Sequence, residues 1–150
     1  MMKHIEIAIA EIGHQEEPKG SNWGAHVQKY LKSVGIAFPA SWCMAFVYWC
    51  VTEAYGKTPM IKNGGVLKQW NSIPAQYKVK YPKPGDIFIM NFGKGLGHTG
   101  FIERLEEGAN GTIVHTIEGN ATTINGSREG IEVCRKNTRR LSDFVGFIRL

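Results

Sequence analysis

The sequence predicts an α+β fold in which N-terminal helices pack on a C-terminal antiparallel β-sheet. Apolar residues recur at helical spacing up to Tyr55, whereas after Pro84-Gly85 the apolar period changes to two. Helices followed by strands are typical of helices packed on an antiparallel sheet. The chain has 150 residues, the usual size of one compact domain. We therefore expect a single domain over residues 1–150.

Three helices are expected in the first half. The first covers about residues 5–12, and the second follows Ser21 and Asn22, which are good N-cap residues. The third, at about residues 42–55, is apolar on most sides, which is typical of a buried central helix. A short helix is expected at 66–70. The expected strands lie at 86–90, 99–105, 112–118, 130–135 and 144–149, with a hairpin turn at 108–111.

The formal net charge of +5 favours contact with polyanions such as nucleic acid or an anionic cell surface. There is no zinc-finger spacing and no base-stacking motif, so nucleic acid is not the expected ligand. No apolar run approaches the roughly 20 residues of a membrane helix, so no membrane insertion is expected. The first residues lack the apolar core of a signal peptide. We expect a monomer that is synthesised in the cytoplasm without a signal peptide.

The three cysteines are Cys43, Cys50 and Cys134. An odd number without a short-spaced pair argues against a disulfide framework and against a thiolate metal site. Cys43 lies in the first turn of the third helix, where unpaired N–H groups stabilise a thiolate and can bind an oxyanion. Cys43 is therefore the candidate nucleophile. Cys50 is expected in the core, and Cys134 is expected to be structural.

A cysteine nucleophile needs an imidazole base. His98 is the candidate, because it follows the glycine-rich segment 93–97 and begins a strand. A loop histidine without a role is the alternative. Of the other histidines, His4, His14 and His26 are expected at the surface. His115 lies in an expected strand and could face solvent or core.

Glu118 and Asn120 lie two residues apart, so both side chains can point to one face of the sheet. Either could accept a hydrogen bond from the imidazole and orient it. The alternative for both is an ordinary polar strand end. Nearby aromatic residues could line a groove, although core packing is their commoner role. These are Trp42, Tyr81 and Phe92.

Four segments in this order resemble the CHAP family, the cysteine, histidine-dependent amidohydrolases/peptidases. They are Ser41-Trp42-Cys43-Met44-Ala45-Phe46-Val47, Pro84-Gly85-Asp86-Ile87, Gly97-His98-Thr99-Gly100-Phe101-Ile102 and Glu118-Gly119-Asn120. The resemblance implies a papain-like fold, related to NlpC-like cell-wall peptidases. It also implies that Cys43 is the nucleophile, His98 the base, Glu118 the orienting group and Asn120 a further polar residue of the site.

The resemblance implies cleavage of an amide bond in bacterial peptidoglycan, by an endopeptidase or an N-acetylmuramoyl-L-alanine amidase. The expected place of action is the cell wall or periplasm, as for a phage lysin or a secreted effector. Two alternatives stay open: a cysteine amidohydrolase acting on a non-wall amide, and a catalytically silent wall-binding module. Some members of the family bind calcium through an acidic loop. Only Glu16 and Glu17 are near that position, so neither a metal nor a cofactor is expected.

Overall fold

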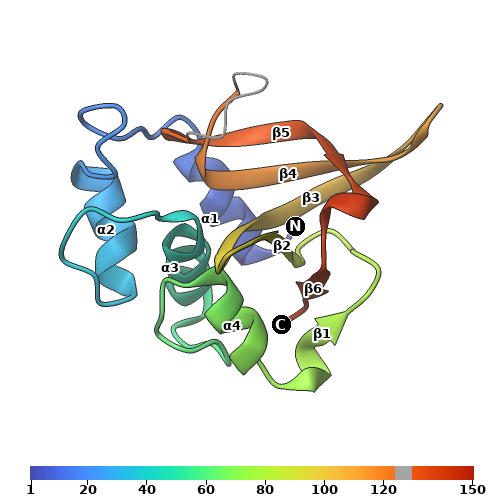
Figure 1. Ribbon diagram of the computed structural model, residues 1–150, viewed down its shortest axis with the longest axis horizontal. Helices are drawn as coiled ribbons and strands as arrows, with labels where there is room; N and C mark the ends of the chain where they lie inside the picture. Colours follow the sequence, from blue (N-terminus) through green and yellow to red (C-terminus); the bar gives the residue numbers. More distant parts are fainter. Residues whose placement is uncertain (124–129) are drawn as a thin grey trace.

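The computed structural model describes residues 1–123 and 130–150 and confirms the α+β prediction. The described helices come first, and an antiparallel sheet follows (Figure 1). This arrangement is consistent with a papain-like fold. The helices are α1 (Lys3–Glu11), α2 (Ala25–Ser33), α3 (Cys43–Tyr55) and α4 (Val66–Ser72). The strands are β1 (Lys78–Val79), β2 (Ile87–Gly93), β3 (Leu96–Gly108), β4 (Gly111–Ala121), β5 (Glu132–Arg140) and β6 (Gly146–Ile148).

The helix ends follow local chemistry. Helix α3 ends as predicted, because Gly56 takes the left-handed conformation (φ 74°) that a residue with a Cβ adopts only with strain. Helix α2 begins at Ala25, later than predicted. The Ser21 hydroxyl donates to the Pro18 carbonyl instead of capping a helix, and Asn22 has a positive φ of 55°.

The strand order in the sheet is β1-β6-β2-β3-β4-β5, and neighbouring strands pair in antiparallel fashion throughout the part of the chain that the structure describes. The short strand β1, which precedes β2 in the chain, was not predicted. Strands β2 and β3 are longer than predicted, because the glycine-rich segment turns at Lys94 (φ 57°) and pairs on both sides of the turn. This segment is therefore the tip of a hairpin. His98 lies within β3 rather than at its start.

The main core lies between the helices and one face of the sheet. Helix α3 is its centre, because it packs on α1, α2, β3 and β4, and eight of its residues are buried. Ile87 and Ile89 of β2 belong to this core, whereas Phe88 and Met90 belong to a smaller apolar cluster. Alternation along β2 places that cluster on the other face of the sheet. Within residues 1–123 and 130–150, no helix combines the length and the apolar character that crossing a bilayer requires.

Candidate active site

Cys43 lies in the first turn of the third helix, as predicted: it is the first residue of α3 and is buried, with 6% of the residue exposed. Cys50 is fully buried in the same helix and Cys134 is buried on β5, so the prediction of a core position for Cys50 is confirmed. Burial raises the pKa of the Cys50 thiol well above its ordinary value and that of Cys134 to about 12. Both thiols are therefore protonated and unreactive near neutral pH.

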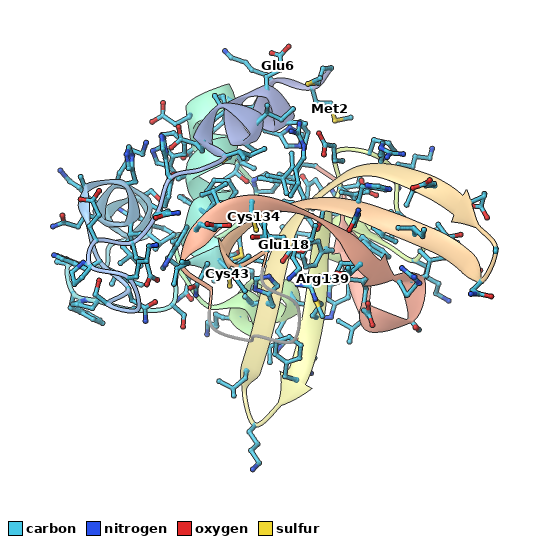
Figure 2. All side chains as sticks on the ribbon, turned by 90° about the horizontal axis from the view of Figure 1, so that it is seen from above. Met2, Glu6, Cys43, Glu118, Cys134 and Arg139 are labelled. Carbon is cyan, nitrogen blue, oxygen red and sulfur yellow. The ribbon has the colours of Figure 1, made fainter. Side chains whose placement is uncertain are left out.

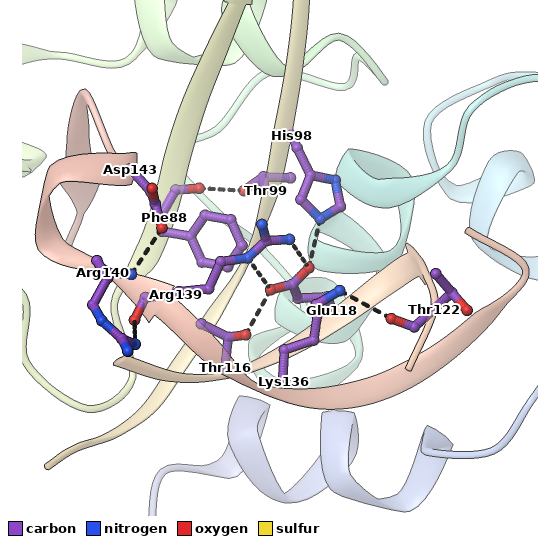
Figure 3. Close-up of polar contacts among 10 residues, drawn as sticks. All are labelled: Phe88, His98, Thr99, Thr116, Glu118, Thr122, Lys136, Arg139, Arg140 and Asp143. Atoms are coloured by element: carbon purple, nitrogen blue, oxygen red, sulfur yellow. Dashed lines mark hydrogen bonds and ion pairs between the residues drawn. The ribbon is translucent and has the colours of Figure 1, made fainter. Parts of the chain in front are cut away.

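Strands β3 and β4 make room for the start of α3. Their pairing runs from the Gly108–Gly111 turn to Phe101–Ile117 and involves no residue of β3 before Phe101. Figure 1 shows the two strands spreading apart on that side, with α3 packed against both. Cys43 at the helix start and Glu118 on β4 consequently lie close together (Figure 2), and His98 on β3 points to Glu118 (Figure 3).

The His98 ring joins the thiol to the carboxylate. Its Nε2 lies 2.7 Å from Oε1 of Glu118, and the ring also hydrogen bonds to Cys43. Burial alone would lower the pKa of His98, but the hydrogen bonds and charges of Cys43 and Glu118 outweigh it and raise the pKa to about 9. At neutral pH the ring is therefore an imidazolium, with Nε2–H donating to the Glu118 carboxylate.

Glu118 is completely buried yet anionic. Burial would raise its pKa, but hydrogen bonds from His98 and Arg139 and their positive charges hold the pKa well below its ordinary value. Arg139 donates from Nε to Oε2 (3.0 Å) and from Nη2 to Oε1 (2.7 Å), and the Thr116 hydroxyl donates to Oε2 (2.6 Å). Figure 3 shows these contacts converging on the carboxylate. Four hydrogen bonds compensate for the lost hydration.

Two glycines permit these close approaches. A Cβ on Gly100 would stand 3.0 Å from Cγ of Glu118 and 2.8 Å from the Phe88 ring, so the glycine lets the carboxylate side chain lie across β3. A Cβ on Gly119 would stand 2.7 Å from Cβ of Phe46 and would push α3 away from β4. Both positions therefore require glycine, because a side chain there would displace Glu118 or helix α3.

Asn120 lies close to Cys43, His98 and Glu118, but its amide is hydrogen bonded to other groups than the His98 ring. With the amide assigned the orientation that satisfies both of its ends, its nitrogen donates to the Gly130 carbonyl (2.9 Å) and its oxygen accepts from the Trp42 backbone N–H (3.3 Å). Its positive φ of 53° turns it away from the regular strand alternation that would place it with Glu118. Between the two residues left open by the sequence, Glu118 is the one bonded to the imidazole, and Asn120 ties β4 to the start of α3.

The structure shows which of the candidate aromatic residues are buried, and it corrects one histidine prediction. Trp42 is fully buried, and its Nε1–H donates to Glu16, so it does not line a groove. Tyr81 and Phe92 are exposed. The prediction of a surface position for His4 is wrong: the ring is buried and hydrogen bonds to the Tyr55 hydroxyl and the Gly85 carbonyl.

Sequence reasoning did not identify Arg139, Thr116 or Glu16 as parts of the site. Thr116 precedes Glu118 by two residues on one strand, a spacing that could have suggested it. The cluster of basic residues at 135–140 contained Arg139, but nothing in that cluster indicates which member faces inward.

One group of side chains has the composition of a metal site. Glu11, His14 and His26 bring their ligand atoms within 4.8 Å of one another. Their present arrangement serves other contacts, since the imidazoles stack in parallel at 3.6 Å and Oε1 of Glu11 accepts from Lys29 and Tyr30. Parallel stacked rings direct their lone pairs side by side rather than at a common centre. We therefore interpret the cluster as a set of hydrogen bonds and ring contacts that holds α1 and the residues after it against α2.

Comparison with known families gives one match: the CHAP domain, over residues 34–120. The match covers more than half of the chain and contains Cys43, His98, Glu118 and Asn120. Searches of curated proteins and of solved structures found nothing similar. CHAP domains generally are amidases or peptidases of peptidoglycan. The chain belongs to the CHAP-domain family.

Proposed function

We propose that this protein hydrolyses an amide bond of bacterial peptidoglycan through an acyl-enzyme on Cys43. The observation that carries the proposal is the His98 ring, which bonds to the Cys43 thiol on one side and to the buried Glu118 carboxylate on the other. This is the nucleophile–base–orienting group arrangement of cysteine hydrolases. Family membership supports peptidoglycan as the substrate class, and the net charge of +5 favours accumulation at an anionic wall.

In the acylation step, the Cys43 thiolate attacks the amide carbonyl carbon. The resulting oxyanion lies at the start of α3, where backbone N–H groups without intrahelical partners can donate to it. The C–N bond then breaks, and His98 gives its proton to the leaving amine. Asn120 contributes by holding the Trp42 N–H, and with it the first turn of α3, against β4.

Acylation prepares His98 for the second step. The pKa of His98 is raised to about 9 partly by its hydrogen bond and charge interaction with Cys43. When the sulfur becomes a neutral thioester, that contribution disappears and the imidazole can stay neutral near pH 7. It then takes a proton from water, the hydroxide attacks the thioester carbon, and the C–S bond breaks to regenerate the thiolate.

Mass spectrometry of fragments released from purified sacculi tests the proposal and identifies the bond. A free muramyl lactyl group indicates an amidase, whereas cleaved stems or cross-bridges indicate an endopeptidase. Cys43→Ala should release no fragments, and Cys50→Ala should behave like wild type because Cys50 is sealed in the same helix. Retained activity in Cys43→Ala contradicts the mechanism. Sacculus binding without release by the wild type would instead indicate a silent wall-binding module.

A further inference from the structure

Arg139 lies on β5, outside the segment matched by the family, and reaches the carboxylate of Glu118 on the neighbouring strand. Its side chain is 19% exposed and donates to both carboxylate oxygens (Figure 3). A forked guanidinium–carboxylate pair fixes the plane of the carboxylate as well as its position. A single ammonium group or a hydroxyl cannot do both.

The carboxylate depends on this fork for its orientation. His98 and Nη2 of Arg139 both donate to Oε1, each at 2.7 Å. Oε2 accepts from Thr116 and from Nε of Arg139. Without the guanidinium, each oxygen would keep one hydrogen bond, from His98 and Thr116 respectively, and a charged carboxylate would remain buried with less compensation.

We propose that Arg139 is a positioning residue of the active site: its guanidinium fixes Glu118 in the orientation that presents Oε1 to His98 and thereby sets the charge balance of the Cys43–His98 pair. The inference rests on the proposed function, because it takes Cys43 and His98 as nucleophile and base. No residue of the CHAP match extends to position 139.

The charges of four neighbouring groups predict the direction in which loss of Arg139 shifts the Cys43 thiolate. A Cys43 thiolate, the His98 imidazolium, the Glu118 carboxylate and the Arg139 guanidinium sum to zero. A neutral residue at 139 leaves one excess negative charge, which favours proton uptake by the remaining groups. Three other titratable groups lie close to this set: Cys134 and Lys136 on β5, and Asp143 in the short 3-10 helix η2 (Leu141–Asp143). Replacing Arg139 leaves all three unchanged.

The rate of Cys43 alkylation by iodoacetamide, measured against pH, tests the inference without any peptidoglycan. We expect the labelling midpoint of Arg139→Met to lie about one pH unit or more above that of wild type, because the excess negative charge left on the Glu118–His98–Cys43 group disfavours the thiolate. Arg139→Lys keeps the charge but not the fork. The labelling midpoint of Arg139→Lys should differ from that of wild type by less than half the shift seen in Arg139→Met. This variant should nevertheless release sacculus fragments about tenfold more slowly than wild type.

Arg135→Met is the matched control. Arg135 is another β5 arginine with a forked contact to a glutamate, Glu103, but its side chain is 54% exposed. Its replacement should move the midpoint by less than 0.2 pH unit, roughly the size expected of a screened surface charge. Circular dichroism establishes that each variant is folded, and Arg139→Gln replaces Arg139→Met if the latter does not fold.

The outcomes separate the inference from the proposed function. A shifted midpoint in Arg139→Met with an unshifted one in Arg135→Met supports the positioning role, even if the wild type releases no fragments and the proposed function fails. An unshifted midpoint in folded Arg139→Met or Arg139→Gln overturns the role, even if the wild type hydrolyses sacculi.

Discussion

Two histidine–glutamate pairs bridge the same two strands, and their difference is instructive. His98–Glu118 and His115–Glu106 both join β3 to β4 with an Nε2–Oε1 distance of 2.7 Å. The histidine side chains are equally shielded, at 12% and 14% exposure. The carboxylates differ, because Glu118 is fully buried and Glu106 is 47% exposed. The hydrogen-bond length alone therefore does not distinguish the candidate catalytic pair from a surface pair.

What separates the two pairs is the surrounding shell of groups. Glu118 is held by Thr116 and by the fork of Arg139, whereas the arginine near Glu106, Arg104, is exposed and stands 3.9 Å away. In addition, His98 has Cys43 on its other side. Buried charges that are fully hydrogen bonded keep a fixed geometry, while an exposed pair is screened and contributes little.

The strongest test of this comparison replaces each histidine by alanine. We expect His98→Ala to lower the rate of fragment release from sacculi by at least about 1000-fold, because both proton transfers of the proposed mechanism pass through this ring. His115→Ala should keep the rate within about twofold of wild type, as a surface ion pair has little effect. Comparable losses in the two variants would mean that the shell around Glu118 has no catalytic significance.

The pH dependence of stability gives a second test. The folded pKa of His98, about 9, lies above its ordinary value of 6.5. The ring therefore contributes stability that is fully present below pH 6.5 and is lost as the pH rises through 9, on the order of 3 kcal/mol. Urea unfolding at pH 6 and pH 10 should show that His98→Gln lowers the free energy of unfolding more at pH 6.

The matching variant for the pH test is His115→Gln. Because Glu106 is half exposed to solvent, the difference from wild type should be small at both pH values. If the wild-type and His98→Gln curves run parallel from pH 6 to pH 10, the imidazolium is not stabilised by its buried partners. The electrostatic part of the comparison would then be wrong.

The sequence predicts those parts of the site that depend on local structure. Cys43 follows from the expected start of an apolar helix, and His98 from a histidine in a strand next to glycines. The choice between Glu118 and Asn120 could not be made, because strand alternation places both on one face. It is decided by the positive φ of Asn120, which the surrounding fold imposes.

Arg139 could not be found from sequence because its position depends on register. The β4–β5 ladder has irregularities at Val114/Thr116 and at Glu118/Ala121. Each irregularity changes which β5 side chains lie on a given face. Alternation along residues 135–140 therefore cannot tell whether Arg135, Arg139 or Arg140 reaches Glu118. The buried position of His4 has a different cause: it depends on tertiary contacts with Tyr55 and Gly85, which are distant in the sequence.

Replacing each carboxylate by the neutral amide tests how much its charge matters in the two pairs. We expect Glu118→Gln to slow fragment release roughly 100-fold, because the amide no longer stabilises the imidazolium and leaves Arg139 without its anion. Glu106→Gln should keep wild-type activity. Both rates are measured on the same sacculi, with melting curves to establish folding. A folded Glu118→Gln with full activity would show that the charge of the carboxylate is dispensable and that only its shape matters.

The smallest expected effect concerns the space that lets Glu118 lie across β3. In Gly100→Ala, the added methyl would meet the Ile117 carbonyl at 2.7 Å and Cγ of Glu118 at 3.0 Å. Displacement of the carboxylate should slow fragment release about tenfold and lower the free energy of unfolding by about 1–3 kcal/mol. Gly108→Ala, on the same strand, is the matched control, because its nearest neighbours stand at 3.1 Å or more and include the Ile113 side chain, which can shift. Equal activity in the two variants would mean that Glu118 tolerates displacement, and the fixed geometry attributed to its buried shell would not be what distinguishes it from Glu106.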